Sequence, residues 1–312
     1  MRIGLVASMP IASYHCVPIE APHAAQNRNL RVLPSQRSQS DRIANSLPLR
    51  ASAGGELFAL IEEMGALPEP AVMYYTAAVA LALGHLHSKG FLYRDLKPEN
   101  LLLDVDGHLK LCDLGLAKRA ERAYTVVGTP QYLAPEVLRG EGATAASDWW
   151  ALGILVFEML TGQLPFNAQD GSDRSLFTAI KLGVYTWPRE VRRTGKQGRT
   201  LPPSARVHEF VAQLLRQALS EETSSPDCVS NAVEPHRLGS GDGDVAEVCG
   251  HPWLQSFDFQ LLLNGEYPPP FVPKLAGADD DANFGPIDWR GEPVLHTPDY
   301  DAAKWDTVWK DW

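Results

Sequence analysis

The pattern of apolar and polar positions predicts a mainly helical protein between residues 55 and 219. The segment 56–65, ELFALIEEMG, has the period of a short helix that ends at Gly65. The segment 68–90 is apolar nearly all round, so we expect a long, buried helix there. Two further helices are predicted, at Trp149–Leu160 and Phe210–Leu219, and Asp148 is placed to cap the first of them.

A short hairpin interrupts the helical pattern. Two apolar triplets, Leu101–Leu103 and Leu109–Leu111, flank the turn signal Asp106-Gly107. Residues 221–244 are rich in Ser, Gly, Asp and Pro, which is typical of a surface insertion. The pattern therefore favours helices with a small amount of antiparallel sheet.

Both ends of the chain lack a regular pattern. Residues 1–53 have no sustained period of 2 or 3.6, so we expect an irregular leader. Its first fifty residues hold six arginines, six serines and two acids, a weak likeness to an organelle transit peptide that we do not favour. Residues 257–312 are Pro- and Asp-rich and are expected to form an extended tail on a folded body.

Composition narrows the classes of partner and compartment. The formal net charge is −10 and there is no long basic run, which argues against nucleic acid as a partner. No apolar run reaches 18 residues, so we expect no membrane partner. Four scattered cysteines show neither disulfide nor metal-ligand spacing. A reducing compartment, cytoplasmic or nuclear, fits this usage best.

Three motifs in a fixed order carry the chemistry. They are YRDLKPEN at 93–100, DLG at 113–115 and APE at 134–136. With these motifs the chain resembles the serine/threonine protein kinases. GGELF, YRDLKPENLLLD, GTPQYLAPE, DWWALG and PPPFVPKL extend the resemblance to the AGC group, which contains the cyclic-AMP-dependent kinases. The resemblance implies an α+β, protein-kinase-like fold, with a mainly helical large lobe at 54–256 and an AGC-type C-terminal tail at 257–312.

The resemblance also implies roles for single residues in an ATP- and Mg²⁺-dependent reaction. Asp95 would orient a substrate hydroxyl and accept its proton, and Lys97 would stabilise charge on the transferring phosphoryl group. Asn100 and Asp113 would bind Mg²⁺ through hard oxygen ligands, and Leu102 would form the floor under the adenine. Cys112, beside Asp113, is either a reactive thiol near the phosphates or a buried, inert one.

Substrate choice and regulation follow from the same resemblance. Glu56, Glu99 and Glu158 match positions that bind substrate arginines, which predicts protein substrates with basic motifs. Gln131 replaces a further acidic position, so one arginine subsite is expected to be weak. Thr125 stands where this group carries its activating phosphate, which would pair with Arg94.

Further implied contacts are structural. The resemblance pairs Glu136 with Arg237 in a buried ion pair. It also makes Trp309–Trp312 a hydrophobic motif that docks on a small lobe. His85, His87 and His251 have no metal-ligand spacing, and we interpret them as packing or surface residues.

One part of a complete kinase is not found in the sequence. Residues 1–53 contain no GxGxxG loop, and no lysine precedes Lys89. We therefore expect a truncated record of an active kinase. In the chain as written, the apolar face that should meet the small lobe, including Leu102, is expected to be exposed. The alternative is a catalytically inactive, kinase-derived binding module. An unrelated metal-dependent hydrolase using Asp95 and Asp113 is a weaker third hypothesis. The sequence shows no cyclic-nucleotide-binding domain, so we expect any such control to come from a separate regulatory subunit or from a segment lost from the record.

Overall fold

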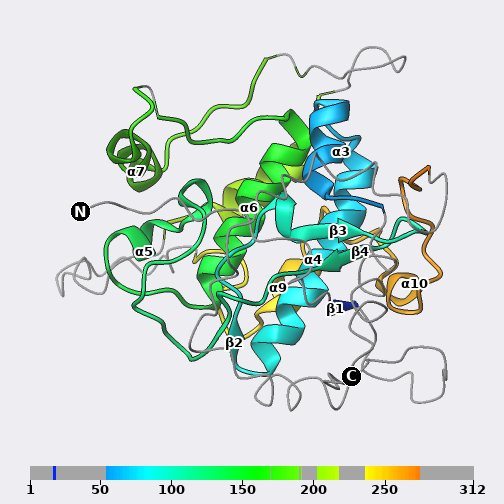
Figure 1. The fold of residues 1–312 in the computed structure, drawn as a ribbon, viewed down its shortest axis with the longest axis horizontal. Coiled ribbons are helices and arrows are strands. Elements are labelled where there is room, and N and C mark those ends of the chain that lie inside the picture. The colour runs from blue at the N-terminus through cyan, green and yellow to red at the C-terminus, as the bar shows by residue number, and fades with distance from the viewer. Residues whose placement is uncertain are drawn as a thin grey trace, which may run out of the picture.

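The fold was obtained as a computed structural model, which describes residues 54–168, 170–189, 191, 202–217 and 236–274, together with the backbone of 17–18 (Figure 1). The leader (apart from 17–18), residues 221–235 of the expected insertion, and tail residues 275–312 with Trp309–Trp312 lie outside the described residues. The helices are α3 (Leu57–Met64), α4 (Glu69–Ser88), α5 (Pro135–Leu138), α6 (Ala145–Thr161), α7 (Asp173–Leu182), α8 (Ala205–Leu214), α9 (Val245–Cys249) and α10 (Phe259–Leu263), with 3₁₀ turns η2 (Pro98–Asn100) and η3 (Pro130–Tyr132). The strands are β1 (Val17–Pro18), β2 (Phe91–Leu92), β3 (Leu101–Leu103), β4 (Leu109–Leu111) and β5 (Lys118–Arg119).

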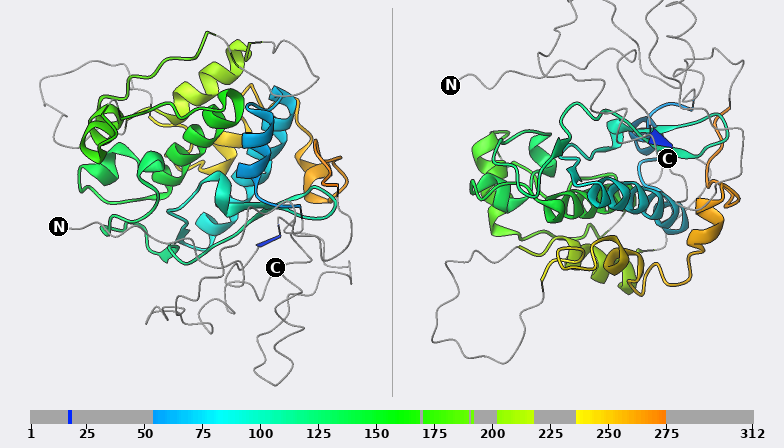
Figure 2. Two further views of the ribbon diagram at one scale, coloured as in Figure 1. Left: turned by 45° about the horizontal axis from the view of Figure 1, so that its top comes forward. Right: turned by 90° about the horizontal axis from the view of Figure 1, so that it is seen from below.

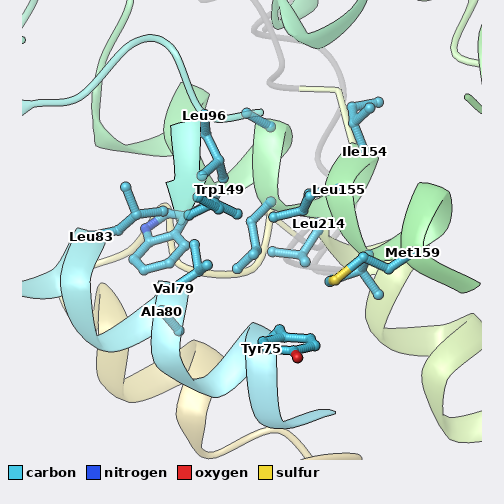
Figure 3. Close-up of a cluster of buried hydrophobic side chains, with 14 of the residues drawn as sticks. Tyr75, Val79, Ala80, Leu83, Leu96, Trp149, Ile154, Leu155, Met159 and Leu214 are labelled. Atoms are coloured by element: carbon cyan, nitrogen blue, oxygen red, sulfur yellow. The ribbon is translucent and has the colours of Figure 1, made fainter. Parts of the chain in front are cut away.

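Helices α4 and α6 lie side by side at the centre of the molecule and form its core (Figure 1). Val79 and Leu83 of α4 meet Trp149 and Leu155 of α6, and Leu214 of α8 closes the cluster (Figure 3). Burial of such side chains contributes about 1.5–3 kcal/mol each to the free energy of folding. Figure 2 shows α8 and α9 on the side of this pair away from the β3–β4 hairpin.

The helix boundaries follow from local chemistry. Helix α3 ends at Gly65, whose positive φ of 74° suits glycine, as the sequence predicts. Helix α4 covers the predicted long helix and is buried on most of its faces. Helix α6 begins earlier than predicted, at Ala145, because Thr144 and Ser147 form a capping box. The predicted capping role of Asp148 is therefore wrong.

The predicted hairpin is confirmed. β3 and β4 pair antiparallel, with Leu102 opposite Lys110. β1 adds a third strand, with Val17 opposite Leu111, which departs from the irregular leader expected there. Among the described residues, a second sheet pairs β2 with β5, with Phe91 opposite Arg119. A bridge between Glu56 and Leu102 attaches the start of α3 to the hairpin.

The beginning of the predicted tail packs against the hairpin. α10 lies beside it in Figure 1, and the following segment runs along the turn. A side chain at Gly107 would meet the carbonyl oxygen of Phe271 at 2.0 Å, and φ there is 92°. Gly107 is therefore required both by the turn and by the close approach of residues 269–271.

A buried ion pair joins distant parts of the helical body. Glu136 in α5 accepts two hydrogen bonds from the guanidinium of Arg237, and the side chain of Ser147 donates a third. The guanidinium also lies over the ring of Trp150, 5.1 Å from its centroid. The ion pair predicted for Glu136 and Arg237 is confirmed. None of the helices in the described ranges is long and apolar enough to cross a membrane.

Candidate active site

The carboxylate of Asp95 is the centre of the candidate site. It lies in the loop between β2 and η2, with 7% of the residue exposed. Its Oδ1 accepts hydrogen bonds from the backbone N–H and the hydroxyl of Thr129, at 3.2 and 3.1 Å. Its Oδ2 accepts one from the amide of Asn100 at 2.9 Å and lies 3.4 Å from Lys97 Nζ. Three hydrogen bonds and one ion pair therefore hold this carboxylate in one orientation.

Asn100 and Asp113 are brought together by the hairpin. Asn100 is only 3% exposed, and its carbonyl oxygen accepts a hydrogen bond from the N–H of Cys112, at 2.9 Å. Asp113 follows directly, at a positive φ of 53°, and its Oδ1 accepts from the N–H of Gly115 at 3.0 Å. This donor set fits Mg²⁺, which takes one or two protein oxygens and completes its shell with phosphates and water. Among the described residues no three His, Cys, Asp or Glu side chains cluster as metal ligands.

A second buried carboxylate fixes the backbone that carries Asp95. Asp148 Oδ1 accepts from the N–H of Arg94 at 2.8 Å, and its Oδ2 accepts from the N–H of Tyr93 at 3.0 Å. Arg94 needs such support because its φ is 68°, a conformation that non-glycine residues adopt rarely. The sequence reasoning missed Thr129 and Asp148 in these roles. Both stand inside motifs that it had used, GTPQYLAPE and DWWALG.

Leu102 is more enclosed than the sequence led us to expect. With the small lobe not found, we expected an exposed apolar face around it, yet Leu102 is only 2% exposed. It is the central residue of β3, flanked by the Glu56 bridge on one side and Lys110 on the other. The expectation of an exposed Leu102 is wrong for this structure. Its role under the adenine stays a prediction.

The three predicted substrate-binding acids are gathered in one region and influence one another. Burial raises the pKa of Glu56 and Glu99, and the charge of Glu99 raises that of Glu56 further. Burial raises the pKa of Glu158 to about 7, although a hydrogen bond from the hydroxyl of Tyr132 opposes the shift. Like charges held together in this way favour a cationic ligand.

Thr125 and Arg94 line the same small cavity, together with Asp95 and Thr129. Arg94 donates its Nε–H to the carbonyl of Leu116, at 2.8 Å. Its Nη1 is buried and has no hydrogen-bond partner within the described part of the chain. A guanidinium with an unused donor beside an exposed threonine is suited to bind an anion at that threonine.

Two sequence interpretations need correction. Cys112 is fully buried, which agrees with the buried alternative and not with a reactive thiol. It is also disulfide-bonded, which the spacing of the cysteines did not indicate. His87 is more than a packing residue, because its two ring nitrogens lie 2.9 and 3.1 Å from carboxylates of Asp148 and Asp244. The interpretation of His251 as a packing residue is confirmed: it is buried against Phe210.

Comparison with known proteins agrees with this geometry. Residues 37–233, more than half of the chain, match the family model described as the protein kinase domain. The chain therefore belongs to the protein kinase family.

Within that family its relatives are AGC kinases. The chain is 39% identical over 232 residues to a cAMP-dependent protein kinase catalytic subunit of Arthrobotrys oligospora, covering 74% of this chain and 39% of the relative. It is 38% identical to the human cAMP-dependent protein kinase catalytic subunit PRKX, covering 74% and 57%. It is 39% identical to human ribosomal protein S6 kinase alpha-2, covering 75% and 28%. The match thus spans less than two thirds of the length of each relative.

Proposed function

We propose that this chain carries the large-lobe half of a serine/threonine kinase active site, which transfers phosphate from ATP to hydroxyl groups of proteins. The observation that carries the proposal is the arrangement around Asp95. Its carboxylate is oriented by Thr129 and Asn100 and lies 3.4 Å from a lysine, and the carbonyl of Asn100 accepts a hydrogen bond from the N–H of Cys112, the residue before Asp113. A structural carboxylate does not require this combination of a lysine and two magnesium-type ligands.

Each residue has a defined task in such a reaction. Mg²⁺-ATP, when bound, supplies the phosphoryl group and the metal charge that balances it. Asp95 would accept a hydrogen bond from the substrate hydroxyl and take up its proton. The fixed donors around its carboxylate would orient it for this step. Lys97 would offset negative charge that develops between the hydroxyl and the phosphate. The oxygens of Asn100 and Asp113 would hold Mg²⁺.

The acidic region supports a basic substrate. Glu56 and Glu99 lie where the charge of one raises the pKa of the other, and Glu158 responds to Glu99 in the same way. An arginine side chain would relieve this repulsion and could bind a carboxylate through two hydrogen bonds. We therefore assign a preference for serine or threonine with arginine two and three residues upstream.

The same proposal extends to organisation and regulation. Residues 54–256 would form the large lobe and residues 257–312 the AGC-type tail. Thr125 would be an activating phosphosite whose phosphate binds Arg94. Protein substrates with basic motifs are the expected partners, and a regulatory subunit is compatible with the cAMP-dependent names of two relatives. The proposed location is the cytoplasm or nucleus.

The alternative is a kinase-derived binding module without catalysis. It is favoured by one observation, which is that residues 1–53 contain neither a glycine-rich loop nor a lysine. Sequencing the 5′ end of the transcript separates the two. An upstream segment that encodes both features, in a product that phosphorylates an arginine-rich peptide and loses this activity on Asp95→Ala, supports the kinase. A product without these features that still binds the peptide supports the module.

A further inference from the structure

The imidazole of His87 lies between two carboxylates from distant parts of the chain. Its Nε2 is 2.9 Å from Asp148 Oδ2, and its Nδ1 is 3.1 Å from Asp244 Oδ1. His87 is near the end of α4, Asp148 is in the first turn of α6, and Asp244 directly precedes α9. Asp148 is the residue that binds the N–H groups of Tyr93 and Arg94. Asp244 is therefore three hydrogen bonds away from the backbone of the loop that carries Asp95, here called the catalytic loop.

Two features of the backbone, at Gly84 and at Asp244 itself, bring the carboxylate of Asp244 to His87. A side chain on Gly84, four residues before the end of α4, would meet Val245 at 2.5 to 2.8 Å. Glycine costs about 1 kcal/mol in a helix interior relative to alanine, and here it allows α9 to approach α4 closely. Asp244 itself has a positive φ of 39°, which is unfavourable for aspartate. Both features place its carboxylate one helical turn along α4, at His87.

The hydrogen-bond pattern requires a protonated ring. Both carboxylates accept, so His87 must donate from both nitrogens, and only the imidazolium has two N–H groups. Burial alone would lower the pKa of His87, but the hydrogen bonds and charges of Asp148 and Asp244 raise it to about 9. In the described residues, these two carboxylates are the charged groups that act on the ring. Asp244 also accepts a hydrogen bond from the indole N–H of Trp149, at 2.7 Å.

We propose that Asp244 is a positioning residue, which holds Asp148 against the catalytic-loop amides through the imidazolium of His87. Without the carboxylate of Asp244, the protonated form of the His87 ring is less stabilised. A neutral ring has only one N–H to donate. Asp148 then loses either its partner or its fixed orientation. The structural part of this inference stands whether or not the chain transfers phosphate. Its effect on rate rests on the proposed function.

The test uses the 312-residue chain and two measurements that do not depend on activity. The first is the pKa of His87 by NMR, assigned with His87→Gln. The second is hydrogen exchange at the amides of Tyr93 and Arg94, compared in the same sample with those of Leu67 and Leu103. The reference amides bond to distant carbonyls, of Met159 and Gly55. Global unfolding accelerates all four amides alike, so their ratio isolates the local effect.

Three variants make the result specific. Asp244→Gly removes the hydrogen bonds of this carboxylate to His87 and Trp149. Because glycine tolerates the positive φ at this position, the loss of stability is limited. Asp244→Asn keeps an acceptor oxygen and removes the charge. Asp242→Asn is the control, because this residue is an exposed carboxylate in the same loop.

We expect Asp244→Gly to lower the pKa of His87 and to accelerate exchange at Tyr93 and Arg94 on the order of tenfold relative to the reference amides. Asp244→Asn should lower the pKa with a smaller change in exchange, and Asp242→Asn should change neither. If Asp244→Gly lowers the pKa but the exchange ratio stays at its wild-type value, Asp244 is only a local contact and the proposal is overturned. An unchanged pKa would overturn it as well.

Discussion

The guanidinium of Arg237 makes two hydrogen bonds, of 2.6 and 2.9 Å, to the carboxylate of Glu136, a residue 101 positions earlier in the chain. Both side chains are almost completely buried. Burial alone would raise the pKa of Glu136, but the hydrogen bonds and charge of Arg237 hold it below its usual range. The pair therefore stabilises the folded chain at pH values above the ordinary pKa of glutamate. This contribution is lost as the pH falls through the lowered pKa of Glu136.

Arg237→Met should destabilise the chain strongly, because it leaves the carboxylate of Glu136 buried without its counter-ion. We expect a loss of ~3–5 kcal/mol in the free energy of unfolding, measured by urea titration. Arg174→Met, at an exposed arginine of α7, should change it by less than about 0.5 kcal/mol. The double variant Glu136→Leu/Arg237→Met should be less destabilised than the sum of the single variants. A loss below about 1 kcal/mol for Arg237→Met would contradict the assigned role.

Binding of an arginine-rich peptide should depend on pH through Glu158. Its pKa of about 7 means that the carboxyl is largely neutral at pH 6 and charged at pH 8. Since the cation binds the carboxylate, affinity should rise by roughly an order of magnitude over this interval, as measured by fluorescence anisotropy. Glu158→Gln should flatten the profile. Tyr132→Phe removes a donor that lowers the pKa, so the midpoint should move upward. If Glu158→Gln leaves the pH profile unchanged, a group other than Glu158 causes the pH dependence and the prediction is wrong.

Charge reversal at Glu56 should weaken the preference for arginine three residues upstream of the acceptor. Losing one charged hydrogen bond costs ~1.5–3 kcal/mol of binding free energy. The comparison is between two peptides that differ only in arginine or alanine at that position. Glu62→Lys is the matched control, because Glu62 is exposed on α3, the helix that Glu56 directly precedes. Equal discrimination by the Glu56→Lys and Glu62→Lys chains would rule out this subsite.

Phosphorylation of Thr125 should order the loop through Arg94. The phosphate adds nearly two negative charges beside a guanidinium whose Nη1 has no partner in the described part of the chain. We expect the melting temperature to rise by ~2–6 °C. The rise should disappear in Arg94→Gln and persist in Arg174→Gln. A rise that survives in Arg94→Gln would show that another group receives the phosphate.

Local sequence signals predicted part of this fold well. Gly65 marks the end of α3, and Asp106-Gly107 marks the hairpin turn, because such signals act within a few residues. The start of α6 was predicted too late in the chain, because aspartate is a residue type favoured at helix N-caps and Asp148 was expected to be the cap. Its carboxylate instead turns inward to the amides of Tyr93 and Arg94, 55 and 54 positions away. No local pattern specifies such a contact.

In the candidate site, too, the sequence predicted some of the residues and missed others. The motifs identified Asp95, Lys97, Asn100 and Asp113, and the structure brings the first three into direct contact. The contribution of Thr129 depends on how the loop after DLG folds back onto Asp95, which spacing alone does not give. The partnership of His87 with Asp244 depends on the packing of α9 against Gly84, which is a tertiary relationship.

The central claim is that Asp95 and its neighbours form the large-lobe half of a kinase active site. Its most direct test is the rate of Mg²⁺-dependent phosphate transfer from ATP to an arginine-rich serine peptide. Two proteins are compared: the 312-residue chain, and a fusion that places an AGC-kinase small lobe ahead of Gly54. The 312-residue chain should be near background, since loss of even one charge-stabilising group costs about 10²–10³ in rate.

The folded fusion should turn over on the order of 1–100 s⁻¹, and Asp95→Ala should return it to background. A folded fusion that binds ATP yet transfers no phosphate, or one whose rate Asp95→Ala leaves unchanged, would contradict the claim.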